Sequence, residues 1–286
     1  PCDARSGKIL LAARQLNCVH AAAVFIASLD CKSIFLKDVQ SEVFFRAQFV
    51  RGSASDVVAV VNAYTEWKQA SSKYKWCQMN GVSMPAMQQV AGVTDDLLQV
   101  LGHREDAERN LSKFDTAHCS ACKTKVGMHS CVTGGSSESI HAAICAGMGR
   151  KVAYRAPTIG ISSSTKISFV LSDKSSTYSS IHRSSLVTDP SDWIVFCDQM
   201  ISPSGAQTLS SVANINLCTA LLFSTWTKFY IGDGTVIIGN GIGVKLHPQT
   251  LVALRKLKSY WEASLIQDTT TLGEHFIQII SQLIAM

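Results

Sequence analysis

The chain has 286 residues, of which 47% are hydrophobic and 16% are charged, and its formal net charge at pH 7 is +5. This length and composition are typical of about two globular domains and exclude a disordered, highly charged polymer. No window holds about eighteen consecutive apolar residues, so we expect neither a membrane-spanning helix nor a membrane partner.

The first hundred residues predict helices. Residues 7–29 are rich in Ala and Leu, which favour helix, and predict two closely spaced buried helices. Asp56 is a plausible N-cap for the next helix, whose apolar stripe reaches Trp67. Ser83 and Pro85 are start signals for another helix. We expect Trp67 to lie in the core of this bundle because it belongs to the apolar stripe.

Residues 102–137 are polar and end in a Gly/Ser-rich stretch, so they predict a long insertion. Four soft ligand side chains gather in it and suit tetrahedral zinc: Cys119, Cys122, His129 and Cys131. The alternative is a loop with free thiols, since one Cys-x-x-Cys with a tight His-x-Cys is less specific than two paired knuckles. The remaining cysteines sit singly among apolar residues, which favours a reducing, intracellular compartment.

From Lys151 onward the pattern changes to short apolar runs separated by Ser, Gly, Asp and Pro. These runs predict about five strands of a small barrel or sandwich: 159–161, 167–171, 193–197, 217–223 and 235–238. Residues 239–243 superficially suggest a nucleotide-binding glycine loop, but no helix start follows and a hairpin is the better interpretation. Two apolar-periodic segments, 251–265 and 272–283, predict closing helices.

Positive charge concentrates at the start of the strand-rich half. The segment from Arg150 to Arg183 carries six Lys or Arg side chains and one acid, Asp173, so it holds a net charge equal to that of the whole chain. Lys and Arg among Ser, Thr and Tyr suit contact with phosphates. The alternative interpretation is a solvated basic surface without a ligand.

Several motifs resemble, in the same order, the region that follows the motor domains in DExH-box RNA helicases. They include Ala27-Ser28-Leu29 followed by Ile34-Phe35, the long stretch from Ser55 to Leu101, Ala142 to Met148, and Ile181 to Ser185 followed by Trp193-Ile194-Val195-Phe196. Ile34 and Arg183 stand where the family has proline, and the Tyr-Pro that normally follows the third motif is missing. The helical tail after a glycine hairpin looks like the RNA helicase A / maleless-like branch.

The resemblance implies a multi-domain α+β fold. It places an N-terminal α-helical ratchet bundle before a five-stranded OB-like β-barrel and C-terminal helices. The corresponding parts are a ratchet (HA2-like) region over 1–101, the Cys/His insertion over 102–137, a closing helix over 138–150, an OB-fold over 151–246 and a helical extension over 247–286. No Gly-x-x-x-x-Gly-Lys-Ser/Thr segment is present, so this chain lacks the ATPase motif and should be inactive alone.

In this family the ratchet region and the OB-fold close a channel for single-stranded RNA over the motor. The resemblance therefore implies single-stranded RNA, the motor domains of the parent chain and proteins of a ribonucleoprotein complex as partners. ATP and Mg would belong to the parent, and no cofactor is expected here apart from the zinc already considered. The expected RNA-binding side chains come from the barrel: Lys151, Tyr154, Arg155, Lys166, His182, Arg183 and Ser184.

Three other interpretations stay open. His182 and Ser184 can satisfy local backbone groups of a turn without touching RNA. The whole chain can be a non-catalytic interaction module, in which the OB-fold docks a partner protein and the RNA groove is degenerate. It can also be a stand-alone protein that lost its motor. The start at Pro1, without signal-peptide features, indicates a fragment boundary.

Overall fold

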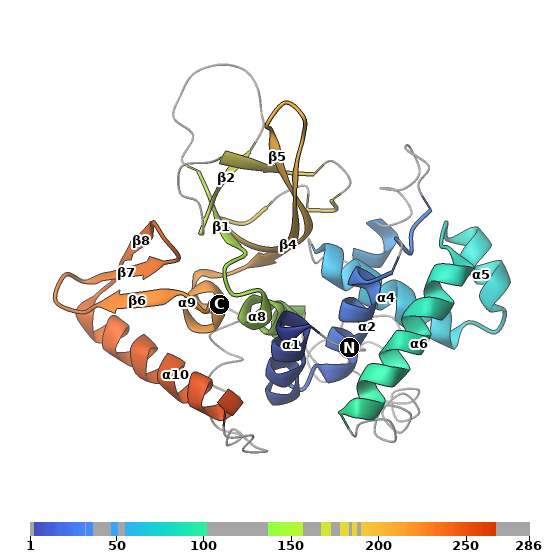
Figure 1. The fold of residues 1–286 in the computed structure, drawn as a ribbon, viewed down its shortest axis with the longest axis horizontal. Coiled ribbons are helices and arrows are strands. Elements are labelled where there is room, and N and C mark those ends of the chain that lie inside the picture. Colours follow the sequence, from blue (N-terminus) through green and yellow to red (C-terminus); the bar gives the residue numbers. More distant parts are fainter. Residues whose placement is uncertain are drawn as a thin grey trace.

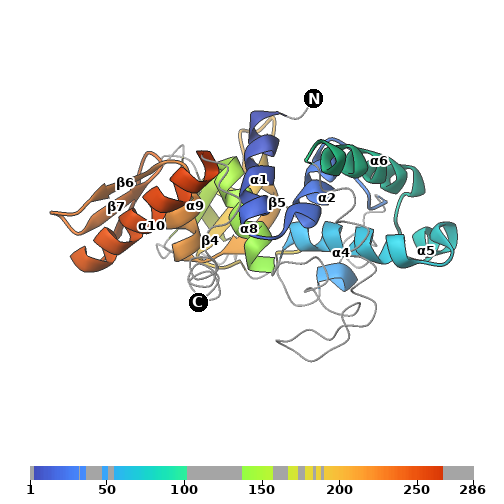
Figure 2. The same ribbon diagram turned by 90° about the horizontal axis from the view of Figure 1, so that it is seen from below.

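The computed structural model describes residues 3–31, 33–36, 47–50, 55–101, 137–156, 167–172, 178–182, 185–187 and 190–266. Three parts lie side by side: a helical region, a five-stranded barrel, and a three-stranded sheet backed by a long helix (Figures 1 and 2). The predicted α+β class, with helices first and an OB-like barrel after them, is confirmed.

Six helices of the described chain build the first part: α1 (Ala4–Gln15), α2 (Val19–Leu29), α4 (Asp56–Gln69), α5 (Lys73–Met79), α6 (Met84–Val100) and α8 (Ser137–Met148). The predicted pair over 7–29 is confirmed as α1 and α2. The Ser83 hydroxyl accepts from the Ala86 N–H at 3.4 Å and caps α6, as predicted. The predicted Asp56 cap is wrong by one residue, since the Ser55 hydroxyl accepts from the Val58 N–H at 3.3 Å instead.

Small residues let these helices approach closely. The run from Ala21 to Ala27 in α2 is entirely buried, as is most of α8. Gly147 of α8 faces α1, where an added Cβ would lie 2.9 Å from the Arg5 carbonyl oxygen and would collide with the Ile9 side chain. Trp67 is 3% exposed, so its predicted place in the core is confirmed.

The barrel closes through the strand order β1-β2-β3-β5-β4, with β4 returning to pair with β1. Its strands are β1 (Val152–Arg155), β2 (Ser168–Leu171), β3 (Tyr178–Ile181), β4 (Trp193–Ile201) and β5 (Gln207–Ile215). All neighbours are antiparallel except β3 and β5. One face of each strand fills the interior, where Phe169, Leu171, Ile194, Phe196 and Leu209 pack together.

The predicted strands at 167–171 and 193–197 correspond to β2 and the first half of β4. The predicted strand at 217–223 is wrong, because Leu217–Phe223 forms helix α9. The Asn216 side chain caps this helix by accepting from the Thr219 N–H at 2.7 Å. A short buried apolar run has no period that separates strand from helix, which explains the error. The predicted strand at 159–161 and the predicted helix at 272–283 lie outside the described residues.

The third part follows α9. Strands β6 (Thr227–Tyr230), β7 (Thr235–Ile238) and β8 (Ile242–Lys245) form an antiparallel sheet, and α10 (Pro248–Ile266) lies against it (Figure 1). The predicted hairpin at 239–243 is confirmed as the β7–β8 turn, and the predicted strand at 235–238 as β7, although β7 belongs to this sheet and not to the barrel.

Lys258 fastens α10 to the end of α9. Its ammonium donates to the carbonyls of Leu221 and Leu222, each at 3.2 Å, and to that of Ser224. Positive charge at a helix C-terminus satisfies carbonyls that lack a partner inside the helix. Burial lowers the pKa of Lys258 to about 8, and the charge of Glu262 partly offsets this effect.

A buried polar network joins the helical region to the barrel. The Asp56 carboxylate, 3% exposed, accepts from the Ser185 hydroxyl and the Leu186 N–H at 2.8 Å, and from the Val212 N–H at 2.9 Å. A carboxylate that accepts three buried donors holds the segments that carry those donors in fixed register. Asp56 thus places the barrel on the first turn of α4.

His141 of α8 extends this network. Its Nε2 lies 2.8 Å from the hydroxyl of Ser55, the residue that caps α4. Burial lowers the pKa of His141 to about 4, while the charge of Glu138 and a hydrogen bond to the Asn214 backbone act in the opposite direction. The imidazole is therefore neutral at pH 7.

Among the described residues, no helix combines the length and the apolar character that crossing a bilayer requires.

Candidate nucleic-acid interface

Tyr154 and Arg155, two of the expected RNA-binding residues, end strand β1, and their side chains have different neighbours. Tyr154 is half-buried, and its ring centroid lies 4.9 Å from that of Trp193 on the neighbouring strand. Arg155 is half-buried where β1 ends, and its N–H donates to the Asp192 carbonyl at 2.8 Å. The β1 backbone is therefore fixed on the β4 side up to the point where the Arg155 side chain leaves the strand.

Lys151 lies at the other end of β1. Its ammonium donates to the Cys197 carbonyl of β4, and its own carbonyl accepts from the Phe196 N–H at 3.0 Å. The side chain thus braces β1 against β4. Lys151 would have to exchange the Cys197 carbonyl for a phosphate in order to bind RNA.

His182 follows β3 and is half-buried. Its N–H donates to the Leu209 carbonyl at 2.8 Å, and its carbonyl accepts from the Ser185 N–H at 2.9 Å. These bonds close the turn that leads to the Asp56 network. Because β1 and β3 both run antiparallel to β2, Arg155 and His182 lie at the same end of their strands.

The other expected residues lie outside the described residues. They are Lys166, Arg183 and Ser184, together with the candidate zinc ligands Cys119, Cys122, His129 and Cys131. Within the described ranges no group of three His, Cys, Asp or Glu side chains could hold a metal ion.

Sequence reasoning missed Tyr178. The strand register aligns Tyr178 with Val170, Val170 with Tyr154, and Tyr154 with Trp193, so one row crosses β3, β2, β1 and β4. Alternation sends Ala153, Phe169 and Ile194 into the barrel, which places this row on its outer surface. Burial decreases along the row, from Trp193 at 6% exposed to Tyr178 at 62% exposed.

The row ends in an exposed aromatic ring on the β2–β3 surface. This is the surface through which OB-folds bind single strands, and aromatic rings there stack on bases without strict sequence preference. Arg155 can supply positive charge and His182 a hydrogen-bond donor at one end of the same strands. The arrangement can therefore hold a polynucleotide by stacking and phosphate contact.

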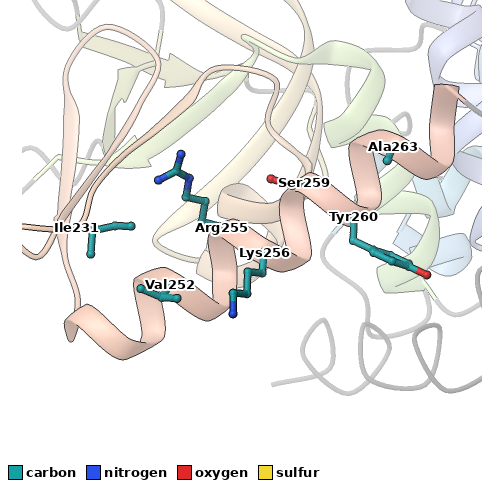
Figure 3. Close-up of a pocket in the computed structure, with 7 residues that line it drawn as sticks. All are labelled: Ile231, Val252, Arg255, Lys256, Ser259, Tyr260 and Ala263. Atoms are coloured by element: carbon teal, nitrogen blue, oxygen red, sulfur yellow. The ribbon is translucent and has the colours of Figure 1, made fainter.

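A groove of about 610 Å³ lies elsewhere, along the outer face of α10. Arg255, Lys256 and Tyr260 line it together with the smaller side chains Val252, Ser259 and Ala263 of the helix and Ile231 from the end of β6 (Figure 3). Among the described residues that line it, two are cations and none is an acid.

Comparison with known proteins relates the chain to a family model and to curated relatives. Residues 3–123 match the family model of the helicase-associated domain (HA2), ratchet-like. The ATP-dependent RNA helicase TDRD9 of Danio rerio is 26% identical over 109 residues, covering 34% of this chain and 8% of that protein. The chain therefore spans only a small part of this relative. The N-terminal helical region is similar to the ratchet-like HA2 domain of the DExH-box RNA helicase family.

Proposed function

We propose that this chain is the RNA-holding region of an ATP-dependent DExH-box RNA helicase. A closed OB-like barrel, fixed by Asp56 to an HA2-like helical region, is the observation that carries the proposal. The parent protein would hydrolyse ATP with Mg to remodel RNA or ribonucleoprotein. This region would close the single-stranded RNA channel over the motor domains.

The proposed contacts are those of the barrel. Arg155, with Lys166 and Arg183, would neutralise phosphates, while His182 and Ser184 would donate to a base or sugar. Tyr178 would stack on a base, and Tyr154 would support it from the same row. The helix α10 after the barrel favours the RNA helicase A / maleless-like branch. A cation that contacts phosphate releases counterions, so its loss weakens binding most at low salt.

Anisotropy of labelled oligouridine, titrated with the full chain at several salt concentrations, tests this proposal. We expect a steep negative slope of log affinity against log salt, and Arg155→Ala should lower the magnitude of that slope by about one. Tyr178→Ala should weaken binding by about 1–3 kcal/mol without changing the slope, and Tyr178→Phe should retain most of it.

Tyr74→Ala is the matched control, because Tyr74 on α5 is 63% exposed and Tyr178 is 62% exposed. Undetectable or salt-independent binding by the folded chain would refute strand holding. RNA-stimulated ATP hydrolysis by the isolated chain would refute the division between this region and an ATPase motor.

The groove on α10 favours a second candidate function, a module that docks a protein. Its two cations and apolar floor suit an acidic amphipathic helix. Binding of such a helix by the full chain, abolished by Lys256→Glu, would favour this second function if RNA binding also shows no salt dependence.

A further inference from the structure

The turn that follows α8 carries a stacked cation. The Arg150 guanidinium carbon lies 3.3 Å from the centroid of the Trp226 ring, and Trp226 is 38% exposed. Arg150 is exposed. A guanidinium that lies flat on an indole keeps its N–H edges available, and this edge geometry matches the paired oxygens of a phosphate.

A second cation converges on the same place from α1. The Lys8 ammonium donates to the Thr225 hydroxyl at 3.1 Å. Thr225 precedes Trp226 in the chain, and its hydroxyl would lie 2.6 Å from a Cβ added at Gly149, next to Arg150. Gly149 also has φ of +56°, a conformation that favours glycine. Thr225 thus accepts from one cation, and the residue after it stacks with the other.

The backbone around this cluster is held by all three parts of the molecule. The Arg150 carbonyl accepts from the Ser172 hydroxyl at the end of β2, and the Trp226 carbonyl accepts from the Gly239 N–H at 2.6 Å. The Asn240 N–H in turn donates to the Ser172 carbonyl at 2.6 Å. Because these bonds fix the backbone that carries the stacked pair, they reduce the ordering cost of binding.

The charges of the cluster are uncompensated within the part of the chain that the structure describes. There, the ion pairs between side chains are Arg5 with Asp3 and Lys258 with Glu262, and neither involves Lys8 or Arg150. Two cations that form no ion pair among the described residues, together with a hydroxyl, suit an anion that carries several oxygens.

We propose that Lys8, Arg150 and Thr225, with Trp226 as the support of the guanidinium, bind a phosphate group of an RNA strand. This inference rests on the proposed function only for the source of the phosphate. Arg150 precedes Arg155 by five residues, so their backbones lie at most about 17 Å apart, at opposite ends of β1. The site is a second contact, separate from the β2–β3 surface of the barrel.

The test uses the full chain and two probes, oligouridine and inorganic phosphate. In the anisotropy titration, the double variant Lys8→Ala/Arg150→Ala should lower the magnitude of the salt slope by about one, since the site holds one phosphate, and weaken binding on all RNA sequences alike. Arg150→Lys keeps the charge but loses the planar fork, so it should keep most of the slope and lose part of the affinity. Lys73→Ala is the control, since Lys73 lies 4.8 Å from the Trp67 ring on the far side of the helical region.

Nuclear magnetic resonance with inorganic phosphate gives the second readout. Phosphate should shift the Arg150 Nε–H and Gly149 N–H signals; Arg150→Lys should reduce the change at Gly149, and Lys8→Ala/Arg150→Ala should abolish it. An unchanged salt slope in the double variant, while Arg155→Ala still weakens RNA binding, would overturn this site and leave the proposed function intact. If phosphate shifts the Arg150 signal but the chain binds no RNA, the phosphate site stands and RNA is refuted as the source of the phosphate. Absence of both effects would overturn the site.

Discussion

Replacing Asp56 should separate the barrel from the helical region more than any surface change. Its carboxylate serves three donors, the Ser185 hydroxyl and the N–H groups of Leu186 and Val212, at 2.8 to 2.9 Å. A buried donor that loses its acceptor costs about 1–3 kcal/mol. Asp56→Ala should therefore lower the free energy of unfolding by about 3–5 kcal/mol, the range for removing one member of a buried charged network.

Urea unfolding followed by circular dichroism measures this change. With a denaturant slope of about 2 kcal/mol/M, the midpoint should fall by about 2 M. Asp56→Asn keeps one acceptor oxygen and should cost roughly half as much. Asp96→Ala, at an exposed position on α6, is the control and should stay within about 0.5 kcal/mol of the parent.

Hydrogen exchange locates the effect. In Asp56→Ala the amides of Leu186 and Val212 should exchange faster, because both have lost their acceptor, while the amides within α6 should change little. A loss of less than about 1 kcal/mol, or unchanged exchange at these two amides, would show that the carboxylate does not hold the barrel in place.

Three further outcomes follow from buried groups and one turn. The pKa of His141 is lowered to about 4 from 6.5, so its contribution to the free energy of unfolding is complete above pH 6.5 and is lost as the pH falls to 4. Urea unfolding should show a loss of about 3 kcal/mol over this range, and His141→Gln should remove this pH dependence. An unchanged pH profile in that variant would contradict the assignment. The pKa of Lys258 is lowered to about 8 from 10.5, so its contribution to the free energy of unfolding grows as the pH rises between these values. Lys258→Met removes the donors to the α9 carbonyls and should speed hydrogen exchange in α10. Equal exchange in the variant and the parent would contradict this role. Gly239→Ala should lower the free energy of unfolding by about 2 kcal/mol or more in thermal unfolding, since φ is +65° and the new Cβ would collide with the Ser172 carbonyl. Gly243→Ala is the control, because the added Cβ meets open space there, and it should be milder. Similar losses in the two variants would contradict the close approach.

Local signals predicted the helices well. The start of α6 at Ser83–Pro85 and the apolar stripe through Trp67 each depend on residues that lie close together in the sequence. The spacing of those residues is therefore enough to predict them. The glycine turn after β7 is equally local. The structure confirms each of these features.

Long-range features could not be read in the same way. Asp56 looks like a helix cap in sequence, yet its partners lie 129 to 156 residues away. Strand β3 contains four residues, Tyr178 to Ile181, too few and too polar for a period of two to emerge. Tyr178 therefore became visible only when the register aligned it with Tyr154. Arg150 and Trp226 lie 76 positions apart and likewise needed the fold to meet.

Ultraviolet cross-linking of the full chain to oligouridine, followed by peptide mass spectrometry, tests the central claim most directly. If the barrel holds the strand, cross-linked peptides should include Tyr178 and His182, and Tyr178→Phe should keep the protein folded while reducing cross-links at that position. Cross-links confined to α5, α6 or the α10 groove, or none at all from the folded chain, would contradict the account.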